Sequence, residues 1–317
     1  MPDLVEADRI RAAAARIREI AHRTPILKSR SFDEASGVNA FFKCENFQRG
    51  GAFKIRGAAN FIFSAPPQDL TRGVVAYSSG NHAQAVAIAA RHLGIPATLV
   101  MPADAPKAKL DATRAQGATI VTYDRRTQSR EAIGQEIAAA EGALLVPPFD
   151  HPHIIAGQGT AALELLEDMP YLDALSAPVG GGGLISGCAV AAKDINPEIR
   201  IFGVEPEGAN DTFLSLQARR RIAVPQPETI ADGLRAPCPG EITFPIIQRL
   251  VERVILVTED EIRATLRFIL TRLKILVEPS GAVSAAAILF RKLPPDVRSV
   301  GVILSGGNVD FDDLARL

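Results

Sequence analysis

Four consecutive glycines, Gly180 to Gly183, constrain this chain more than any other stretch. They follow residues 172–179, which read as a short buried strand, and precede residues 184–193, whose small and apolar residues recur at helical spacing. Residues without a Cβ leave backbone N–H groups open to close approach, and the start of a helix favours negative charge. The run therefore predicts a site for a compact dianion such as a phosphate monoester. A flexible turn is the alternative, although two glycines would satisfy a turn.

The composition is that of an ordinary globular chain. Its 317 residues allow two domains, 47% of them are hydrophobic, and the formal net charge of -1 predicts no nucleic-acid partner. No apolar run approaches the length of a membrane span, and residues 1–20 read as an amphipathic helix without a signal-peptide core, so we expect a cytoplasmic protein without a membrane partner. Cys44, Cys188 and Cys238 lack metal-ligand spacing, and neither a disulfide framework nor a zinc site is expected.

Helical and strand-like segments alternate along most of the chain, which predicts α/β layers with parallel sheets. Strands are expected at residues 74–77, 97–101, 118–123, 144–146, 172–179, 200–204 and 300–304, and helices at residues 81–92, 105–116, 127–141, 159–168, 184–193, 260–273 and 281–291. The run that ends before Pro147-Pro148 reads as a compact sub-unit. We expect a small domain over residues 73–146 and a large domain over residues 1–68 and 149–317.

Lys54 follows two glycines and Phe53 and opens a helical pattern. The positive end of a helix dipole lowers the pKa of an amine from about 10.4, and burial beside an aromatic ring lowers it further. A deprotonated amine can form a Schiff base with a carbonyl compound. Taken alone, however, a lysine in a sequence is usually a solvated surface group.

Polar groups also follow predicted strands or precede predicted helices. Residues 78–82 follow a strand, and ligands collect at strand ends in open α/β sheets, so their hydroxyls and amides could hold a carboxylate. The same residues could simply cap the next helix. Ser305 also follows a strand and could hydrogen-bond a heteroaromatic nitrogen. For the loop that starts at Glu278, before a helix, capping is again the alternative.

Glu205, Ala209 and Asp211 lie in one short loop and offer two carboxylates and a backbone carbonyl. Such a set suits a hard cation that takes oxygen ligands and retains waters. Acidic loops are common, so these residues alone leave the presence of a cation open.

Four of these motifs together resemble one known set, that of the fold type II pyridoxal-phosphate enzymes. They are Ala52-Phe53-Lys54-Ile55-Arg56-Gly57-Ala58, Ser78-Ser79-Gly80-Asn81-His82, Gly180 to Gly183, and Ser305-Gly306-Gly307-Asn308. The chain is most similar to the threonine/serine dehydratase and serine racemase group, over nearly its whole length. The resemblance implies a two-domain fold like that of the tryptophan synthase β subunit, with twisted, mostly parallel sheets flanked by helices.

The resemblance also implies roles for individual residues. Lys54 would bind the cofactor aldehyde and remove the substrate α-proton, and Ser79 would act on the opposite face, as in serine racemases. The implied cofactor contacts are Phe53, Lys54, Asn81, Gly180, Gly181, Gly182, Gly183, Leu184, Glu278 and Ser305. The implied substrate contacts are Ser78, Ser79, Asn81, His82 and, near the distal end, Arg130. A divalent cation (Mg²⁺, Mn²⁺ or Ca²⁺) at Glu205, Ala209 and Asp211 and a homodimer are implied as well.

The first functional hypothesis is a β-eliminating ammonia-lyase that converts L-threonine and L-serine to a 2-oxo acid and ammonia. Many threonine dehydratases carry alanine where this chain has Ser79, which makes serine racemisation an alternative. Ala52 and residues 147–153 are similar to 3-hydroxyaspartate ammonia-lyases, a second alternative in which Arg130 would meet a second carboxylate. A non-catalytic protein that binds a phosphorylated metabolite is the alternative from a different class.

Overall fold

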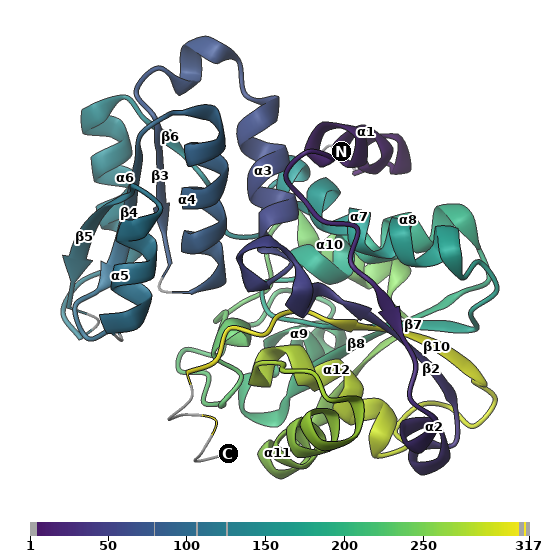
Figure 1. The fold of residues 1–317 in the computed structure, drawn as a ribbon. Helices are drawn as coiled ribbons and strands as arrows, with labels where there is room; N and C mark the ends of the chain where they lie inside the picture. The colour runs from purple at the N-terminus through teal and green to yellow at the C-terminus, as the bar shows by residue number, and fades with distance from the viewer. Residues whose placement is uncertain (1–4, 79, 106, 125, 311–313, 315–317) are drawn as a thin grey trace.

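The computed structural model describes residues 5–78, 80–105, 107–124, 126–310 and 314, and its strands form two sheets (Figure 1). The six-stranded sheet has the order β1-β2-β10-β7-β8-β9, and the four-stranded sheet has the order β5-β4-β3-β6. The strands of the first are β1 (Ile26–Leu27), β2 (Asn39–Cys44), β7 (Ala174–Pro178), β8 (Arg200–Pro206), β9 (Arg253–Val257) and β10 (Ser299–Leu304). Those of the second are β3 (Val74–Tyr77), β4 (Ala97–Pro102), β5 (Thr119–Tyr123) and β6 (Leu144–Leu145).

Among these strands, only β1 and β2 pair antiparallel, and every other pair is parallel. Parallel sheets are covered on both faces, because the connection between two parallel strands is usually a helix that packs on the sheet. The predicted α/β class, with mostly parallel sheets flanked by helices, is therefore confirmed. The division into two domains with the expected boundaries stays a prediction.

The helices supply the apolar faces that bury these sheets. They are α1 (Ala7–Ile17), α2 (Arg30–Ser36), α3 (Lys54–Ser64), α4 (Asn81–Leu93), α5 (Lys107–Ala115), α6 (Arg130–Glu141), α7 (Pro152–Asp168), α8 (Gly183–Ile195), α9 (Asp211–Ala218), α10 (Thr243–Leu250), α11 (Glu259–Phe268) and α12 (Pro279–Leu289). One core cluster joins α1, α7, α8 and α10 to one face of the six-stranded sheet, and a second joins α2, α11 and α12 to the other face (Figure 1). None of the described helices is long and apolar enough to cross a membrane.

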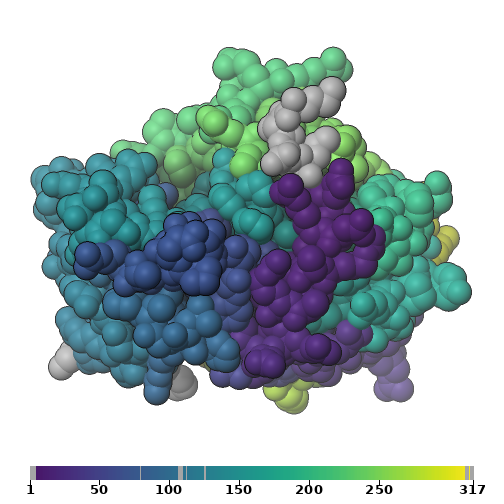
Figure 2. Space-filling model, turned by 90° about the horizontal axis from the view of Figure 1, so that it is seen from above, coloured from purple at the N-terminus to yellow at the C-terminus, as the bar shows by residue number. Residues whose placement is uncertain are grey.

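Helix α3 lies between the two sheets (Figure 1). It packs against α7 on one side and α4 on the other, and its apolar residues belong to the core cluster of the four-stranded sheet. The crossing with α7 is close, because a Cβ on Gly157 would contact the backbone of Arg56 and Gly57. In Figure 2 the purple N-terminal segment lies between the blue residues around α3 and the green-teal residues of α8, and α1 contacts α3, α7 and α8.

Several elements differ from the expected ranges. Helix α7 begins at Pro152, two turns before the predicted start, because the His151 side chain accepts the N–H of His153 and proline suits the first helical position. Helix α11 ends at Phe268, and residues Ile269–Leu273 continue as a π-helical turn. Strands β2 and β9 were not predicted.

Candidate active site

A cavity of about 850 Å³ opens where the strands β3, β7 and β10 end. Ligands collect at this edge of open α/β sheets. The cavity is lined by most of the residues that the sequence assigned to cofactor and substrate: Phe53, Lys54, Ser78, Asn81, His82, Arg130, Gly180, Gly181, Gly182, Gly183, Leu184, Glu278 and Ser305. Ser79 lies outside the described residues. The fold thus brings together segments as distant in the sequence as those of Lys54 and Ser305.

Lys54 is the first residue of α3, and its amine lies inside this cavity. Its Nζ donates to the carbonyl oxygen of Pro148 at 3.0 Å and lies 5.2 Å from the centroid of the Phe53 ring. Burial lowers the pKa of Lys54 to about 8, although the negative charge of Glu278 acts in the opposite direction. An amine with this pKa is partly unprotonated near neutral pH and is therefore a competent nucleophile and base.

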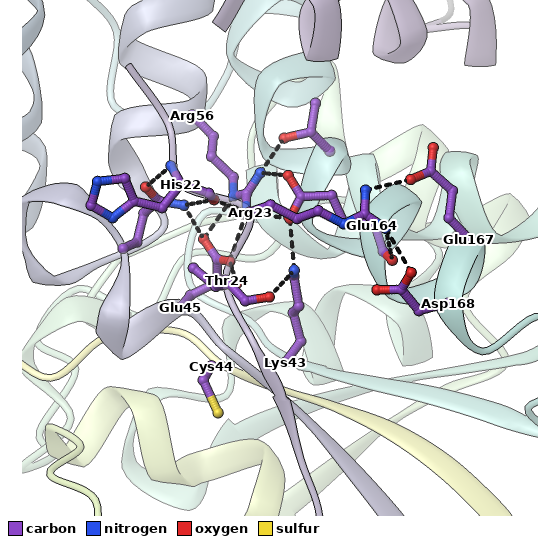
Figure 3. Close-up of polar contacts among 12 residues, drawn as sticks. His22, Arg23, Thr24, Lys43, Cys44, Glu45, Arg56, Glu164, Glu167 and Asp168 are labelled. Atoms are coloured by element: carbon purple, nitrogen blue, oxygen red, sulfur yellow. Dashed lines mark hydrogen bonds and ion pairs between the residues drawn. The ribbon is translucent and has the colours of Figure 1, made fainter. Parts of the chain in front are cut away.

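Two residues after Lys54, Arg56 belongs to a buried network of four charged side chains (Figure 3). Arg56 pairs with Glu45 at 2.7 Å and with Glu164 at 2.7 Å, and Lys43 pairs with Glu164 at 2.6 Å. The side chains of Lys43, Glu45 and Arg56 have no exposed area. Burial alone would raise the pKa of Glu45, but Arg56, Thr24 and Lys43 together outweigh burial and leave that pKa lowered. The two cations balance the two anions and hold the start of α3 against β2 and α7.

The glycine run between β7 and α8 has no room for side chains. A Cβ on Gly181 would contact the ring of Phe149, and one on Gly182 would lie 2.8 Å from the Ile247 and Thr243 side chains. Gly182 also has a φ of 91°, in the left-handed region that favours glycine. Helix α8 begins at Gly183, so its first N–H groups adjoin the run. The missing side chains let Phe149 and α10 pack against the run. Its backbone N–H groups, beside the start of α8, are donors that fit a phosphate group.

Asn81 is held by side chains on both sides. Its Nδ2 donates to Glu278 Oε1 at 2.7 Å, and its Oδ1 accepts from Asn308 Nδ2 at 2.9 Å. Asn308 donates to the Gly50 carbonyl as well, at 2.7 Å. These bonds fix the direction of the Asn81 amide. Ser305 Oγ donates to the Ser280 carbonyl at 3.3 Å and lines the same cavity without adding charge.

His82 is buried at the start of α4, next to residues 78–81. Burial lowers its pKa to about 3, and the positive charge of Lys54 acts in the same direction. The imidazole is therefore neutral. Its Nε2 lies 3.2 Å from the Val146 carbonyl oxygen, and because a carbonyl oxygen only accepts hydrogen bonds, Nε2 carries the proton and donates. The other ring nitrogen, Nδ1, is then an acceptor. Ser78 Oγ accepts the Gly80 N–H at 3.3 Å.

Two arginines line the cavity, one of which the sequence analysis missed. Arg130 begins α6 and donates from Nε to Glu131 Oε1 at 2.8 Å. Arg235, the missed residue, donates from Nε to the Thr229 carbonyl at 2.9 Å. Arg235 directly follows a short 3₁₀ turn, Asp232–Leu234, and no motif in the sequence analysis included it. Pro148, Phe149 and Asp150 line the cavity as well.

The acidic loop lies apart from the residues that line this cavity. Glu205 is fully buried and accepts the backbone N–H groups of Thr212 at 3.1 Å and Phe213 at 2.9 Å. Neither carboxylate oxygen of Asp211 has a partner among the described residues, although both are buried. Burial raises the pKa of Asp211 to about 7, and burial together with Asp211 raises the pKa of Glu205 to about 8. Two carboxylates in this state fit a cation, with the buried Ala209 in the same loop.

Comparison with known proteins shows the family of this chain. Residues 17–306 match the family described as Pyridoxal-phosphate dependent enzyme. The chain is 47% identical over 305 residues to an L-threo-3-hydroxyaspartate ammonia-lyase of Saccharomyces cerevisiae, covering 96% of this chain and 94% of that protein. It is 44% identical over 309 residues to a serine racemase of Schizosaccharomyces pombe, with coverages of 98% and 96%.

Solved structures agree with the sequence comparison. Maize serine racemase superposes with a TM-score of 0.95 at 45% identity, covering 98% of this chain and 96% of that chain. A threonine deaminase from T.th. superposes with a TM-score of 0.90 at 42% identity, with coverages of 96% and 99%. This chain belongs to the pyridoxal-phosphate dependent enzymes, in the fold type II group whose members include serine racemases, 3-hydroxyaspartate ammonia-lyases and threonine deaminases.

Proposed function

We propose that this enzyme catalyses β-elimination from a 3-hydroxy amino acid, which yields a 2-oxo acid and ammonia, and that its preferred substrate is L-threo-3-hydroxyaspartate. The observation that carries the proposal is the presence of two arginines, Arg130 and Arg235, in the cavity that holds Lys54. The loop at the start of α4 already offers donors for one carboxylate. Glu131 also lines the cavity and accepts from Arg130 Nε, so the remaining N–H groups of Arg130 and those of Arg235 are the donors that favour a second substrate carboxylate. Two relatives that are each 47% identical are L-threo-3-hydroxyaspartate ammonia-lyases.

Different residues around the cavity would bind different parts of the cofactor. Gly180 to Gly183 and the start of α8 would hold the phosphate, Ser305 would face the ring nitrogen, and Asn81 would meet the ring hydroxyl. Bound pyridoxal phosphate supplies a conjugated electron sink for the negative charge that develops at the substrate Cα. Because Ser305 is neutral, it leaves the ring nitrogen without a formal counter-charge.

The remaining residues orient the substrate and move its protons. Ser78, Asn81 and the backbone N–H groups that begin α4 would bind the α-carboxylate. The His82 side chain would hold this loop to the Val146 carbonyl. It would not donate to the substrate, because the single N–H of its neutral ring already binds that carbonyl. Lys54, with its pKa lowered to about 8, would take the α-proton without a diffusional step. The β-hydroxyl then leaves as water with the proton that Lys54 took from Cα, and hydrolysis of the enamine product yields the 2-oxo acid and ammonia.

Removing either arginine should affect the dicarboxylic substrate selectively. For Arg130→Gln and Arg235→Gln, kcat/KM on L-threo-3-hydroxyaspartate should fall by roughly 10- to 100-fold, because a charge-assisted hydrogen bond contributes about 1.5–3 kcal/mol. The values on L-serine should stay within about threefold, since serine has no second carboxylate. Steady-state release of ammonia from each substrate measures both.

Arg30→Gln is the matched control, because Arg30 is an exposed arginine with a carboxylate partner, Glu34, at 3.5 Å and does not line the cavity. A wild-type preference for L-threonine or L-serine would support the first sequence-based hypothesis instead. Recovery of D-serine from L-serine would support racemisation. The homodimer and the cytoplasmic location expected from the sequence stay predictions.

We also propose that Glu205, Asp211 and the carbonyl of Ala209 bind a divalent cation, which supports the fold at a distance from Lys54. The support is the pair of buried Asp211 oxygens without partners among the described residues. No group of three or more histidine, cysteine, aspartate or glutamate side chains is arranged for a metal in the described part of the chain. Backbone carbonyls and waters would therefore complete the coordination, as hard cations accept.

Metal-free protein should lose stability as pH rises from about 4 to about 8, and Mg²⁺ should restore stability at the upper end of this range. Both pKa values are raised in the folded state, so the native protein keeps protons that the unfolded chain releases near pH 4. The associated stability is complete below about pH 4 and is lost as pH rises through the folded values. Mg²⁺ binds the deprotonated carboxylates, so its effect on the melting temperature grows with pH.

Thermal denaturation in EDTA and in Mg²⁺ at several pH values tests this. Asp211→Asn should remove the response to Mg²⁺, whereas Glu207→Gln, an exposed carboxylate in the same loop, should retain it. If Mg²⁺ did not change the melting temperature of the wild type above about pH 8, the proposed cation site would be contradicted.

A further inference from the structure

The segment between β6 and α7, residues 147–150, contacts both the amine and the glycine run. The carbonyl oxygen of Pro148 accepts the hydrogen bond from Lys54 Nζ. The ring of Phe149 lies against Gly181. The Cβ atom of Phe149 lies 3.1 Å from the position that a Cβ on Gly183 would take. Asp150 ends the segment, and its carboxylate binds the start of α10.

The carboxylate of Asp150 binds three consecutive backbone N–H groups at the start of α10. Its Oδ2 accepts from Glu241 at 2.7 Å, and its Oδ1 accepts from Ile242 at 2.9 Å and from Thr243 at 3.2 Å. The first N–H groups of a helix have no partner within the helix, and a carboxylate is the acceptor that the helix dipole favours there. Asp150 therefore fixes the start of α10 from a segment that is distant in the sequence.

The start of α10 in turn fixes one peptide of the glycine run. Thr243 Oγ1 donates to the Gly181 carbonyl oxygen at 2.8 Å, and the Gly240 N–H reaches the same oxygen at 3.3 Å. In a trans peptide the carbonyl and the following N–H point in opposite directions. Holding the Gly181 carbonyl toward α10 therefore turns the Gly182 N–H away from α10. Without these bonds, a peptide between two glycines rotates easily.

We propose that Asp150 is a positioning residue for the cofactor phosphate, acting through α10 and Thr243 on the orientation of the Gly181–Gly182 peptide. The inference rests on the phosphate-binding role proposed above for the glycine run, and it does not depend on the substrate. Asp150 does not touch the phosphate in this account. It holds the donors in the orientation in which they bind phosphate.

The test compares binding of pyridoxal phosphate and of pyridoxal, which lacks the phosphate, to the apoprotein. In Asp150→Asn, affinity for pyridoxal phosphate should fall at least about tenfold and affinity for pyridoxal by less than about twofold, because the amide nitrogen cannot accept the N–H that Oδ2 receives. The visible absorbance of the bound aldehyde reports both affinities. The rise in apoprotein melting temperature caused by inorganic phosphate should shrink in parallel.

Thr243→Val gives an independent route to the same result, since it keeps the shape of the side chain and removes the hydroxyl that binds the Gly181 carbonyl. It should show the same selective loss, and it keeps the proposal testable if Asp150→Asn folds poorly. Asp173→Asn is the matched control. Asp173 accepts two backbone N–H groups, from Arg298 at 2.9 Å and Ser299 at 2.8 Å, where β7 and β10 begin, at the opposite edge from the cavity. It should bind both compounds as the wild type does.

The outcomes separate the two proposals. Equal wild-type affinity for pyridoxal phosphate and pyridoxal would overturn the phosphate role of the glycine run, and this inference with it. Wild-type discrimination that persists in Asp150→Asn and Thr243→Val would overturn only the positioning role. An equal loss of affinity for pyridoxal phosphate and pyridoxal would overturn the positioning role too, because a general structural defect would weaken the binding of both compounds.

Discussion

Lys54→Ala should lower turnover by at least about 10⁴-fold and leave the protein folded. The variant loses both the covalent attachment point for the cofactor and the base that takes the α-proton, and proton transfer by a positioned base alone contributes about 10²- to 10⁴-fold. Folding should not suffer, because the buried amine has a lowered pKa, and removing a desolvated amine relieves an unfavourable burial. Activity assays and thermal denaturation measure the two effects.

Borohydride reduction gives a second measurement for Lys54. In the wild type it should fix the chromophore to the peptide that contains Lys54, and in the variant that peptide should carry no label. Lys193→Ala is the matched control, because Lys193 Nζ also donates to a backbone carbonyl, that of Pro197 at 2.8 Å, and lies on the exposed surface of α8. A Lys54→Ala protein that kept its colour and turnover would remove the basis of the proposed function.

Arg56→Met should destabilise the protein by about 3–5 kcal/mol. The substitution preserves much of the side-chain volume but leaves Glu45 and Glu164 without the cation between them, and Glu45 has no exposed area in which to be hydrated. A buried carboxylate that loses its partner must either stay charged at high cost or take up a proton. The urea concentration at the midpoint of unfolding measures the loss.

Arg200→Met controls for the number of ion pairs that are broken. Arg200 also meets two carboxylates, Glu252 at 2.6 Å and Asp296 at 2.9 Å, but its side chain is 27% exposed and Asp296 is 74% exposed. Solvent screens such pairs, so this variant should lose less than about 1 kcal/mol. Similar losses in the two variants would show that burial does not set the strength of the Arg56 network.

Local patterns predicted the parts of the fold that depend on neighbouring residues. The strand Val74–Tyr77 has the predicted bounds, and the glycine run does lie between β7 and α8. Strand β2 was not predicted. Its Lys43 is buried because the Thr24 carbonyl and Glu164, which is 121 positions later, both accept from its Nζ. No window of sequence around β2 contains that information.

The same limit applies to the site. Lys54, Asn81 and Ser305 could be placed in one cavity only through the family resemblance, because β3 and β10, the strands before Asn81 and Ser305, belong to different sheets. The role inferred for Asp150 depends on N–H groups of residues 241–243, and no local pattern marks a side chain that caps a helix so far away. The isolated oxygens of Asp211 also become visible only when the chain has buried them.

The place of α3 between the sheets has a mechanical consequence. A rotation of one sheet against the other about this helix would carry Ser78 and Asn81, which follow β3, along an arc. Lys54 begins α3 itself, and a point near the axis of a rotation hardly travels. Any such rotation would therefore change the distance from Ser78 and Asn81 to the glycine run more than the distance from Lys54 to that run.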